Sequence, residues 1–180
     1  MKNILIISAS PAKDGNTDLL AAEFRKGAEE AGNHTEQVFL RQKKIGYCHA
    51  CNYCKRPETM GICAFKDDMA EIMDQVRAAD VIVLATPVYY YNVNAQMKTF
   101  IDRTFCDFMN LKNKEFYFIL ACTDSGRESI DAAVNGLRGF TVCLEGSVEK
   151  GIVYGVNAPA HGSIKGAQAM HEAYEMGRNV

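Results

Sequence analysis

The stretch KNILIISASPAKDGNT, residues 2–17, decides the fold. Its first part, KNILIIS (2–8), is a short apolar run with β-branched residues. It is too short for a helix and predicts a strand buried on both faces. The remainder is rich in small and polar residues and leads into apolar residues at helical spacing over 16–31. A buried strand, a tight turn and a helix in succession are typical of parallel α/β proteins.

The same alternation continues along the chain. Further strands are predicted at 34–40, 80–87, 114–123 and 150–156, and further helices from Asp67 or Asp68 through Val76 and over 94–109, 127–143 and 164–179. The predicted fold is therefore α/β, a flavodoxin-like doubly wound five-stranded parallel sheet of order 2-1-3-4-5 with helices on both faces. No internal repeat or linker-like tract interrupts the pattern, so we expect residues 1–180 to form a single flavodoxin-like domain.

Composition argues against several classes of partner. The formal net charge is -2 and the pI is about 6.1, so no nucleic-acid partner is expected. No stretch approaches the roughly 18 apolar residues of a membrane helix, and the first apolar run is too short for a signal peptide. We therefore predict a soluble, cytoplasmic protein with no membrane association. The 7 cysteines are an odd number and do not predict a disulfide framework in that compartment.

Ligands of doubly wound sheets bind at the carboxyl ends of the strands, where the strand order reverses. In the loop after the first strand, Gly15 suits a turn with positive φ, and Asn16 or Thr17 suits a helix N-cap whose N–H groups face an anion. The hydroxyls of Ser8, Ser10 and Thr17 add donors. The loop lacks both the Walker and the dinucleotide-binding fingerprints. The alternative is a turn and cap without a ligand.

The loop after the third predicted strand reads TPVYYYNVN and is aromatic at the expected ligand edge. Pro87 stiffens the turn, while Tyr89, Tyr90 and N–H groups around Val88 offer a stacking face and donors to a flat aromatic cofactor. Asn92 is expected to cap the next helix or to reach a ring carbonyl. The alternative is that the tyrosines pack against a neighbouring helix or subunit.

Four cysteines lie in one short segment, three of them spaced as C-x-x-C-x-x-C. Four thiolates in such spacing can hold a [4Fe–4S] cluster. A zinc ion also accepts four thiolates, although its ligands more often come as two separated pairs. A third reading is a thiol-rich lid or dimer contact without metal. The candidate ligands are Cys48, Cys51, Cys54 and Cys63.

Taken together, these motifs resemble the NADPH-dependent FMN reductases of the flavodoxin-like superfamily over roughly residues 2–160. The cysteine segment also resembles that of iron–sulfur flavoproteins. The matching residues are Ser10-Pro11, Gly15-Asn16-Thr17, Cys48, Cys51 and Cys54, Gly61, Cys63, Asp67, Asp68, Thr86 to Tyr89, and Lys98 to Arg103. For Lys98, Asp102 and Arg103 we expect an ion pair on the helix.

The resemblance implies FMN, with its phosphate on Ser10, Asn16 and Thr17. It also implies a ring held by the Pro87–Asn92 loop and by the loop carrying Thr123 and Asp124. In the alternative reading of that last loop, Asp124 caps the helix that follows. The chain departs from the family at Ala12, where an arginine is frequent. That substitution leaves Lys13 as the nearby cation.

The predicted function is an FMN-dependent oxidoreductase that passes electrons from NAD(P)H through the flavin to a quinone, a nitro or azo compound, or a similar acceptor. No side chain is assigned a catalytic role, because the flavin N5 carries the chemistry. One alternative is an iron–sulfur flavoprotein that carries electrons between protein partners. Another is a non-catalytic FMN-binding or sensor protein. The resemblance also implies a homodimer or homotetramer with the flavin at the interface.

Overall fold

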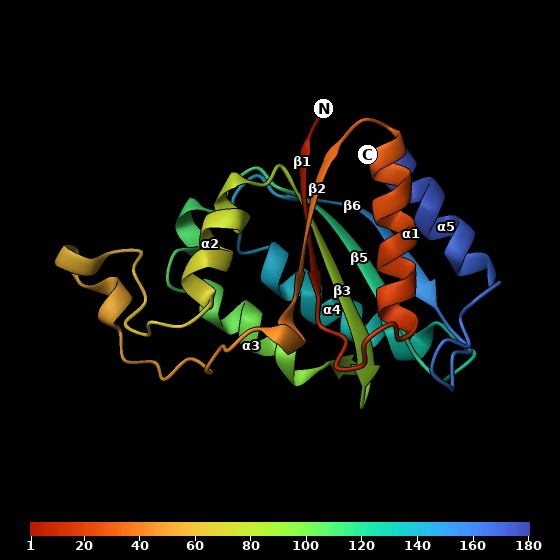
Figure 1. Cartoon of the computed structure of the whole chain (residues 1–180). Coiled ribbons are helices and arrows are strands. Elements are labelled where there is room, and N and C mark those ends of the chain that lie inside the picture. The colour runs from red at the N-terminus through yellow and green to blue at the C-terminus, as the bar shows by residue number, and fades with distance from the viewer.

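The computed structural model describes residues 1–180 and contains five long parallel strands (Figure 1). These are β1 (Asn3–Ser8), β2 (His34–Phe39), β3 (Val81–Tyr89), β5 (Glu115–Ala121) and β6 (Val148–Gly155). They lie in the order β2-β1-β3-β5-β6, and the two-residue strand β4 (Asn92–Val93) pairs antiparallel with β3. The predicted order of the five parallel strands is confirmed. The sequence pattern did not predict β4, which is too short to show a period.

Five α-helices cover the two faces of the sheet (Figure 1). Helices α1 (Asn16–Glu30) and α5 (Gln168–Arg178) pack on one face, whereas α2 (Met69–Ala78), α3 (Ala95–Thr104) and α4 (Glu128–Thr141) pack on the other. Side chains alternate along β1: Ile4 and Ile6 face α1 and α5, while Leu5 and Ile7 face the opposite core. A strand covered on both faces buries every side chain, which explains its unbroken apolar run.

Two predicted helices are shorter in the structure because local hydrogen bonds compete with the helix. Helix α3 ends at Thr104, whose hydroxyl donates to the Ile101 carbonyl at 2.7 Å, and a separate 3-10 turn follows over Phe108–Asn110. The closing helix begins at Gln168 rather than near residue 164. None of the helices combines the length and the apolar character that crossing a bilayer requires.

The start of α1 also differs from the expectation. Gly15 is the N-cap and has φ −72°, so the predicted positive φ at Gly15 is wrong. Asp14 occupies the left-handed region instead, at φ 56°. Neither Asn16 nor Thr17 is the cap. A Cβ on Gly15 would lie 3.2 Å from the Ala12 carbonyl oxygen and 3.3 Å from the Ser10 hydroxyl, so the glycine serves the close approach of this turn rather than a positive φ.

Residues 43–66 form no long element and project away from the sheet beside α2 and α3 (Figure 1). They contain 3-10 turns over Tyr53–Lys55 and Pro57–Thr59, and they carry the four clustered cysteines. We refer to residues 46–67 as the cysteine segment.

Helices α1 and α5 touch through their backbones. A methyl group on Gly27 would collide with the Tyr174 carbonyl oxygen and lie 2.9 Å from the Arg178 nitrogen. A methyl group on Gly177 would collide with the Phe24 carbonyl oxygen. The two glycines therefore set the spacing of the helices on this face.

We expect Gly27→Ala to destabilise the protein. Alanine gains at most about 1 kcal/mol of helix propensity over glycine, whereas overpacking against a backbone costs about 1–3 kcal/mol. Urea unfolding measures the difference. The matched control is Gly139→Ala in α4, where a methyl group meets nothing within 4 Å and should stabilise. A Gly27→Ala variant as stable as the control would contradict the packing described.

Candidate functional site

A cavity of about 240 Å³ opens at the carboxyl edge of the sheet. Its walls come from residues 10–17 after β1, 87–89 at the end of β3, 121–123 at the end of β5 and 158–161 after β6. We call this cavity the slot. The predicted residues Ser10, Asn16, Thr17, Pro87, Val88, Tyr89 and Thr123 all line it.

One end of the slot presents unpaired backbone donors. The N–H groups of Asn16, Thr17 and Asp18 begin α1 and make no hydrogen bond within the chain, the first helical bond being from Leu19 to Gly15. These groups and the helix dipole favour an anion at this position. Thr17 is buried and lines the same end of the slot.

The side chain of Asn16 is bonded to the loop after β6, which forms one wall of the slot. Its Nδ2 donates to the carbonyls of Ala158 and Ala160 at 3.1 and 2.9 Å, and its Oδ1 accepts from the Ile164 N–H at 3.2 Å. His161 lines the slot and contacts the Lys13 carbonyl at 2.8 Å. The loop after β6 is therefore fixed over the start of α1. The residues held in this loop are not helical, so α5 begins only at Gln168.

Asn94 connects two walls of the slot. Its side-chain oxygen accepts from the Met97 N–H at 3.0 Å, which makes it the N-cap of α3, and its Nδ2 donates to the Ala9 carbonyl at 2.5 Å. The residue is only 3% exposed. The prediction that Asn92 caps this helix is wrong, because its side chain accepts from the adjacent Val93 N–H, and the predicted contact to a ring carbonyl stays a prediction. The position of Asn94 immediately before the apolar helical pattern is the sequence signal that identifies it.

The three tyrosines form a hairpin tip between β3 and β4. Tyr90 and Tyr91 occupy the two-residue turn at φ 51° and 59°, a conformation that glycine and asparagine usually take. Tyr90 is fully exposed and does not line the slot, whereas Tyr89 does. The rings of Tyr90 and Tyr91 are exposed, so the alternative of packing against a helix of this chain is not seen, and packing against another subunit stays a prediction.

Ser8 and Asp124, also predicted for the site, bond elsewhere. The Ser8 hydroxyl donates to Asp18 at 2.5 Å, and Asp124 accepts from the Ser129 hydroxyl and, through its carbonyl, from the Asn157 N–H. Neither residue lines the slot.

Three residues in or beside the slot were not predicted from the sequence: Asp18, Arg41 and Cys122. Asp18 pairs with Arg41 at 2.8 Å, and Arg41 also donates to the Ser10 carbonyl at 3.3 Å. A cation other than Lys13 therefore lies beside the loop where Ala12 lacks one. Cys122 lines the slot, and burial raises the pKa of its thiol.

We expect Asn94→Ala to lower stability by about 2 kcal/mol, since it removes an N-cap and leaves the buried Ala9 carbonyl unpaired. Urea unfolding at neutral pH measures the loss. Asn92→Ala, at an exposed position two residues away, is the control and should change stability little. Equal effects of the two substitutions would show that Asn94 does not hold the slot.

The four clustered cysteines line one small cavity of about 30 Å³, together with Cys106 from the end of α3. All of these thiols are free. No three acidic, histidine or cysteine side chains lie close enough together to hold a single ion, and the zinc alternative stays a prediction. In a four-iron cluster each iron takes its own thiolate, so the ligands need not converge on one point. Four thiols around one cavity therefore fit a cluster by their chemistry.

Cys106 differs from the other thiols of this cavity. It is buried, and burial raises the pKa of its thiol to about 11. It therefore stays protonated at neutral pH, unlike a metal-binding thiolate.

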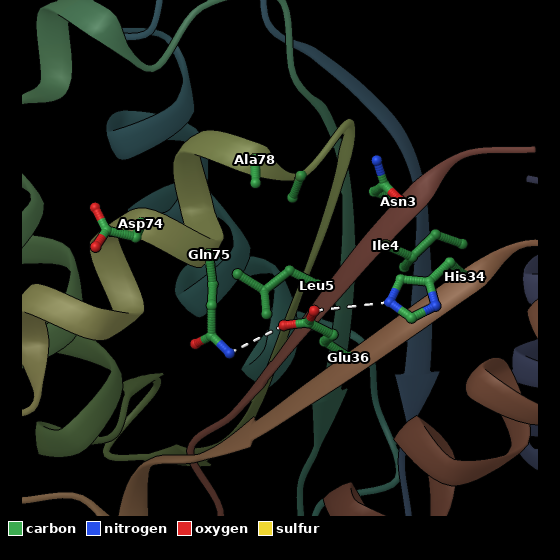
Figure 2. A pocket seen from close by; sticks show the side chains of 9 residues that line it. Asn3, Ile4, Leu5, His34, Glu36, Asp74, Gln75 and Ala78 are labelled. Carbon is green, nitrogen blue, oxygen red and sulfur yellow. Dashed lines mark hydrogen bonds and ion pairs between the residues drawn. The ribbon is translucent and has the colours of Figure 1, made fainter.

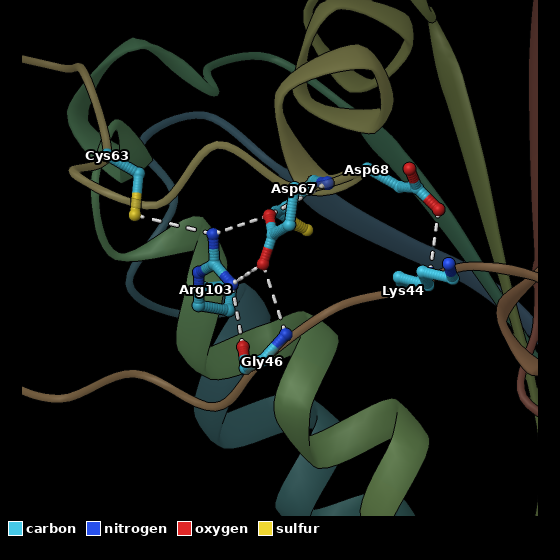
Figure 3. Close-up of polar contacts among 7 residues, drawn as sticks. Lys44, Gly46, Cys63, Asp67, Asp68 and Arg103 are labelled. Carbon is cyan, nitrogen blue, oxygen red and sulfur yellow. Dashed lines mark hydrogen bonds and ion pairs between the residues drawn. The ribbon is translucent and has the colours of Figure 1, made fainter.

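Arg103 clamps the two ends of the cysteine segment together (Figure 3). Its guanidinium donates to the Gly46 carbonyl at 2.6 Å, to both oxygens of Asp67 at 2.7 and 2.9 Å, and to the Cys63 sulfur at 3.4 Å. Asp67 also accepts from the Gly46 N–H at 3.1 Å, and Lys44 and Asp68 form two further backbone contacts next to it. Lys98 and Asp102 form the expected pair at 2.7 Å, but Arg103 pairs across the fold instead.

The Asp67–Arg103 pair makes stability depend on pH. Burial is the largest single effect and raises the pKa of Asp67, but the hydrogen bonds from Arg103 and from the Gly46 and Met69 N–H groups, with the charge of Arg103, together outweigh it, and the pKa lies below its usual 3.8. A carboxyl whose folded pKa is lowered stabilises the fold above its ordinary pKa, and this contribution is lost as the pH falls through the folded value.

We therefore expect Asp67→Asn to destabilise the protein fully at pH 6 and progressively less below about pH 4. Unfolding free energies of both proteins between pH 6 and pH 3 measure the difference. Asp102→Asn, in an exposed pair on α3, is the control. An Asp67→Asn effect that stays constant across this range would contradict the lowered pKa.

Two larger cavities lie elsewhere. One of about 380 Å³ lies between β2 and the end of α2, where Glu36 contacts Gln75 and His34 (Figure 2). The other, of about 490 Å³, is mostly apolar and lies between α3 and the end of α4. Neither borders the carboxyl ends of the central strands, so size alone does not identify the ligand site of this fold.

Comparisons with known proteins agree with this reading of the fold. The sequence profile of the NADPH-dependent FMN reductase family matches residues 2–158. An iron–sulfur flavoprotein of Archaeoglobus fulgidus is 44% identical over 97 residues, which are 54% of this chain and 43% of that protein. An iron–sulfur flavoprotein of Methanocaldococcus jannaschii is 40% identical over 101 residues, 56% of this chain and 51% of that protein. The matches span about half the length of these relatives.

A solved structure shows the same architecture. The NAD(P)H:quinone oxidoreductase from Methanothermobacter marburgensis superimposes with a TM-score of 0.76 over 99% of this chain and 95% of that chain, at 15% identity. At this identity the likeness shows the flavodoxin-like fold alone. Both resemblances inferred from the sequence motifs are confirmed by the family and protein matches.

Proposed function

The chain belongs to the NADPH-dependent FMN reductase family, and from this premise we propose that it is an FMN-dependent oxidoreductase. It passes electrons from NAD(P)H to a quinone, a nitro or azo compound, or a similar small acceptor. The observation that carries the proposal is the set of three unpaired N–H groups at the start of α1, which open into a slot at the carboxyl edge of the sheet.

The residues of the slot fit FMN in three respects. The N–H groups of Asn16, Thr17 and Asp18 and the Thr17 hydroxyl bind the phosphate. Pro87, Val88 and Tyr89 offer an apolar wall and backbone donors to a flat ring. Thr123 and the Cys122 side chain line the wall formed by β5.

FMN, when bound, supplies a ring that accepts hydride and gives up electrons, so no acid–base side chain is required of the chain. The protein's own residues bind the FMN and orient its ring. Asn94 holds the loops after β1 and β3 in register, and Asn16 holds the loop after β6 against α1. The protonated Cys122 thiol keeps this wall free of negative charge at neutral pH.

We expect the purified chain to retain FMN and to oxidise NAD(P)H when menadione is the acceptor. Thr17→Val should weaken FMN binding about tenfold, because one hydrogen bond to a charged group is worth about 1.5 kcal/mol or more. Titration of the apoprotein with FMN, followed by fluorescence quenching, measures this. Thr141→Val, buried on α4 away from the slot, is the control. A colourless protein that does not bind added FMN sinks the proposal, whereas FMN binding without turnover indicates a binding or sensor protein.

A second candidate is an iron–sulfur flavoprotein that carries electrons between protein partners. It is favoured by the four free thiols around one cavity and by the two iron–sulfur flavoproteins that match the sequence. In this candidate Cys48, Cys51, Cys54 and Cys63 hold a [4Fe–4S] cluster, which supplies one-electron transfer when bound.

Anaerobic reconstitution tests the second candidate. We expect about four iron and four acid-labile sulfide per chain, and a loss of most of both in Cys51→Ser. Cys143→Ser, an exposed cysteine outside the segment, should retain them. If wild type and both variants take up equally little iron, the thiols serve as a lid or contact without metal.

We make three further proposals. We propose that residues 1–180 act as one flavodoxin-like domain, since one sheet collects all the long strands. A cytoplasmic location fits seven free thiols. A homodimer or homotetramer fits the exposed tyrosine tip beside the slot.

A further inference from the structure

Arg103 has more donors than the clamp uses. The guanidinium carries five N–H groups, and its terminal nitrogens contact Gly46, Asp67 and the Cys63 sulfur. Its Nε has no hydrogen-bond partner in the chain, and water does not reach it because the residue is only 2% exposed. A buried donor without a partner is rare and costly in a native structure. The side chain also lines the cavity formed by the clustered cysteines.

The clamp does not explain these extra donors. The two ends of the cysteine segment are already joined by contacts that do not involve the guanidinium. These are Lys44 N–H to Asp68 at 2.7 Å, Asp68 N–H to the Lys44 carbonyl at 3.2 Å, and Gly46 N–H to Asp67 at 3.1 Å. The contact to Cys63 and the unpaired Nε contribute nothing to holding these two ends together. Both belong to Arg103, which lines the cysteine cavity.

The charges around the guanidinium indicate how it acts on the cavity. Asp67 forms a two-point ion pair with Arg103 and offsets its charge. The pair also fixes the plane of the guanidinium, so that one terminal nitrogen is directed at the Cys63 sulfur. N–H groups directed at ligating sulfurs are among the factors that set the reduction potential of iron–sulfur clusters. The effect therefore comes mainly from hydrogen bonding rather than from net charge.

We infer that Arg103 is a positioning residue of the cysteine cavity, which orients Cys63 and raises the reduction potential of a cluster bound there. The inference rests on the second candidate function, because it concerns the bound cluster. It assigns Arg103 a role that neither the ion pair expected from the sequence nor the clamp requires. The hydrogen bond stabilises the more negative, reduced form of a thiolate-ligated cluster more than the oxidised form.

The test uses two variants of the full chain, reconstituted anaerobically. Arg103→Met together with Asp67→Asn removes the donors without leaving a lone buried charge, a change that proteins often tolerate. Arg103→Lys keeps the charge but loses the planar guanidinium, which donates from two nitrogens at once. The control is Arg138→Gln with Glu149→Gln, a two-point arginine–carboxylate pair between α4 and β6. Circular dichroism and FMN binding report folding, iron and sulfide content report loading, and a potentiometric titration followed by EPR reports the midpoint potential.

We expect the double variant at Arg103 and Asp67 to have a more negative midpoint potential than wild type. Arg103→Lys should lie between them, and the control should match wild type. Loss of iron from a double variant that still folds and binds FMN also supports the inference, because it shows that Cys63 is no longer oriented. If the double variant does not fold, Arg103→Lys carries the test.

Unchanged iron content and potential in the variants would reduce Arg103 to a structural clamp and overturn the inference. A wild-type chain that folds and binds FMN but takes up no iron would remove the second candidate function and this inference with it. That result would leave the FMN proposal intact, so the two failures are distinguishable.

Discussion

The parallel register of the three central strands is the constraint on which the site depends. Ser8 pairs with Ala85, and Ala85 pairs with Ile119, so β1, β3 and β5 run side by side in one direction toward the same edge. Their loops must therefore leave the sheet together, and α1 begins where they do. The slot is a consequence of this register, and Asn94 fixes it by bonding the loop after β1 to the start of α3.

Helix α3 links the slot to the cysteine segment. Asn94 caps its first turn, and Arg103 lies in its last turn and holds the ends of the cysteine segment. The two residues are separated by about 13 Å of helix, at about 1.5 Å per residue. Because a packed helix is rigid over this length, the slot and the cysteine cavity keep a fixed separation. A flavin in one and a cluster in the other would occupy two ends of one structural unit.

Much of this arrangement could be predicted from the sequence, because it depends on local pattern. The run Ile4–Ile7 predicts a doubly buried strand, and the small residues after it place a loop at the ligand edge. What the pattern could not show are contacts between residues far apart in the chain. Arg103 meets Gly46 and Asp67, and Asn16 meets Ala158, only once the fold brings them together. Asn94 rather than Asn92 is the cap because Asn92 belongs to the short strand β4, and a strand of two residues is too short to show a sequence pattern.

The central claim is that the slot at the carboxyl edge of the sheet binds FMN. A crystal structure of the protein grown with FMN tests it most directly. The account predicts the phosphate at the N-terminus of α1 and the ring against Pro87 to Tyr89. An empty slot, or FMN bound instead in the apolar cavity between α3 and α4, would contradict it.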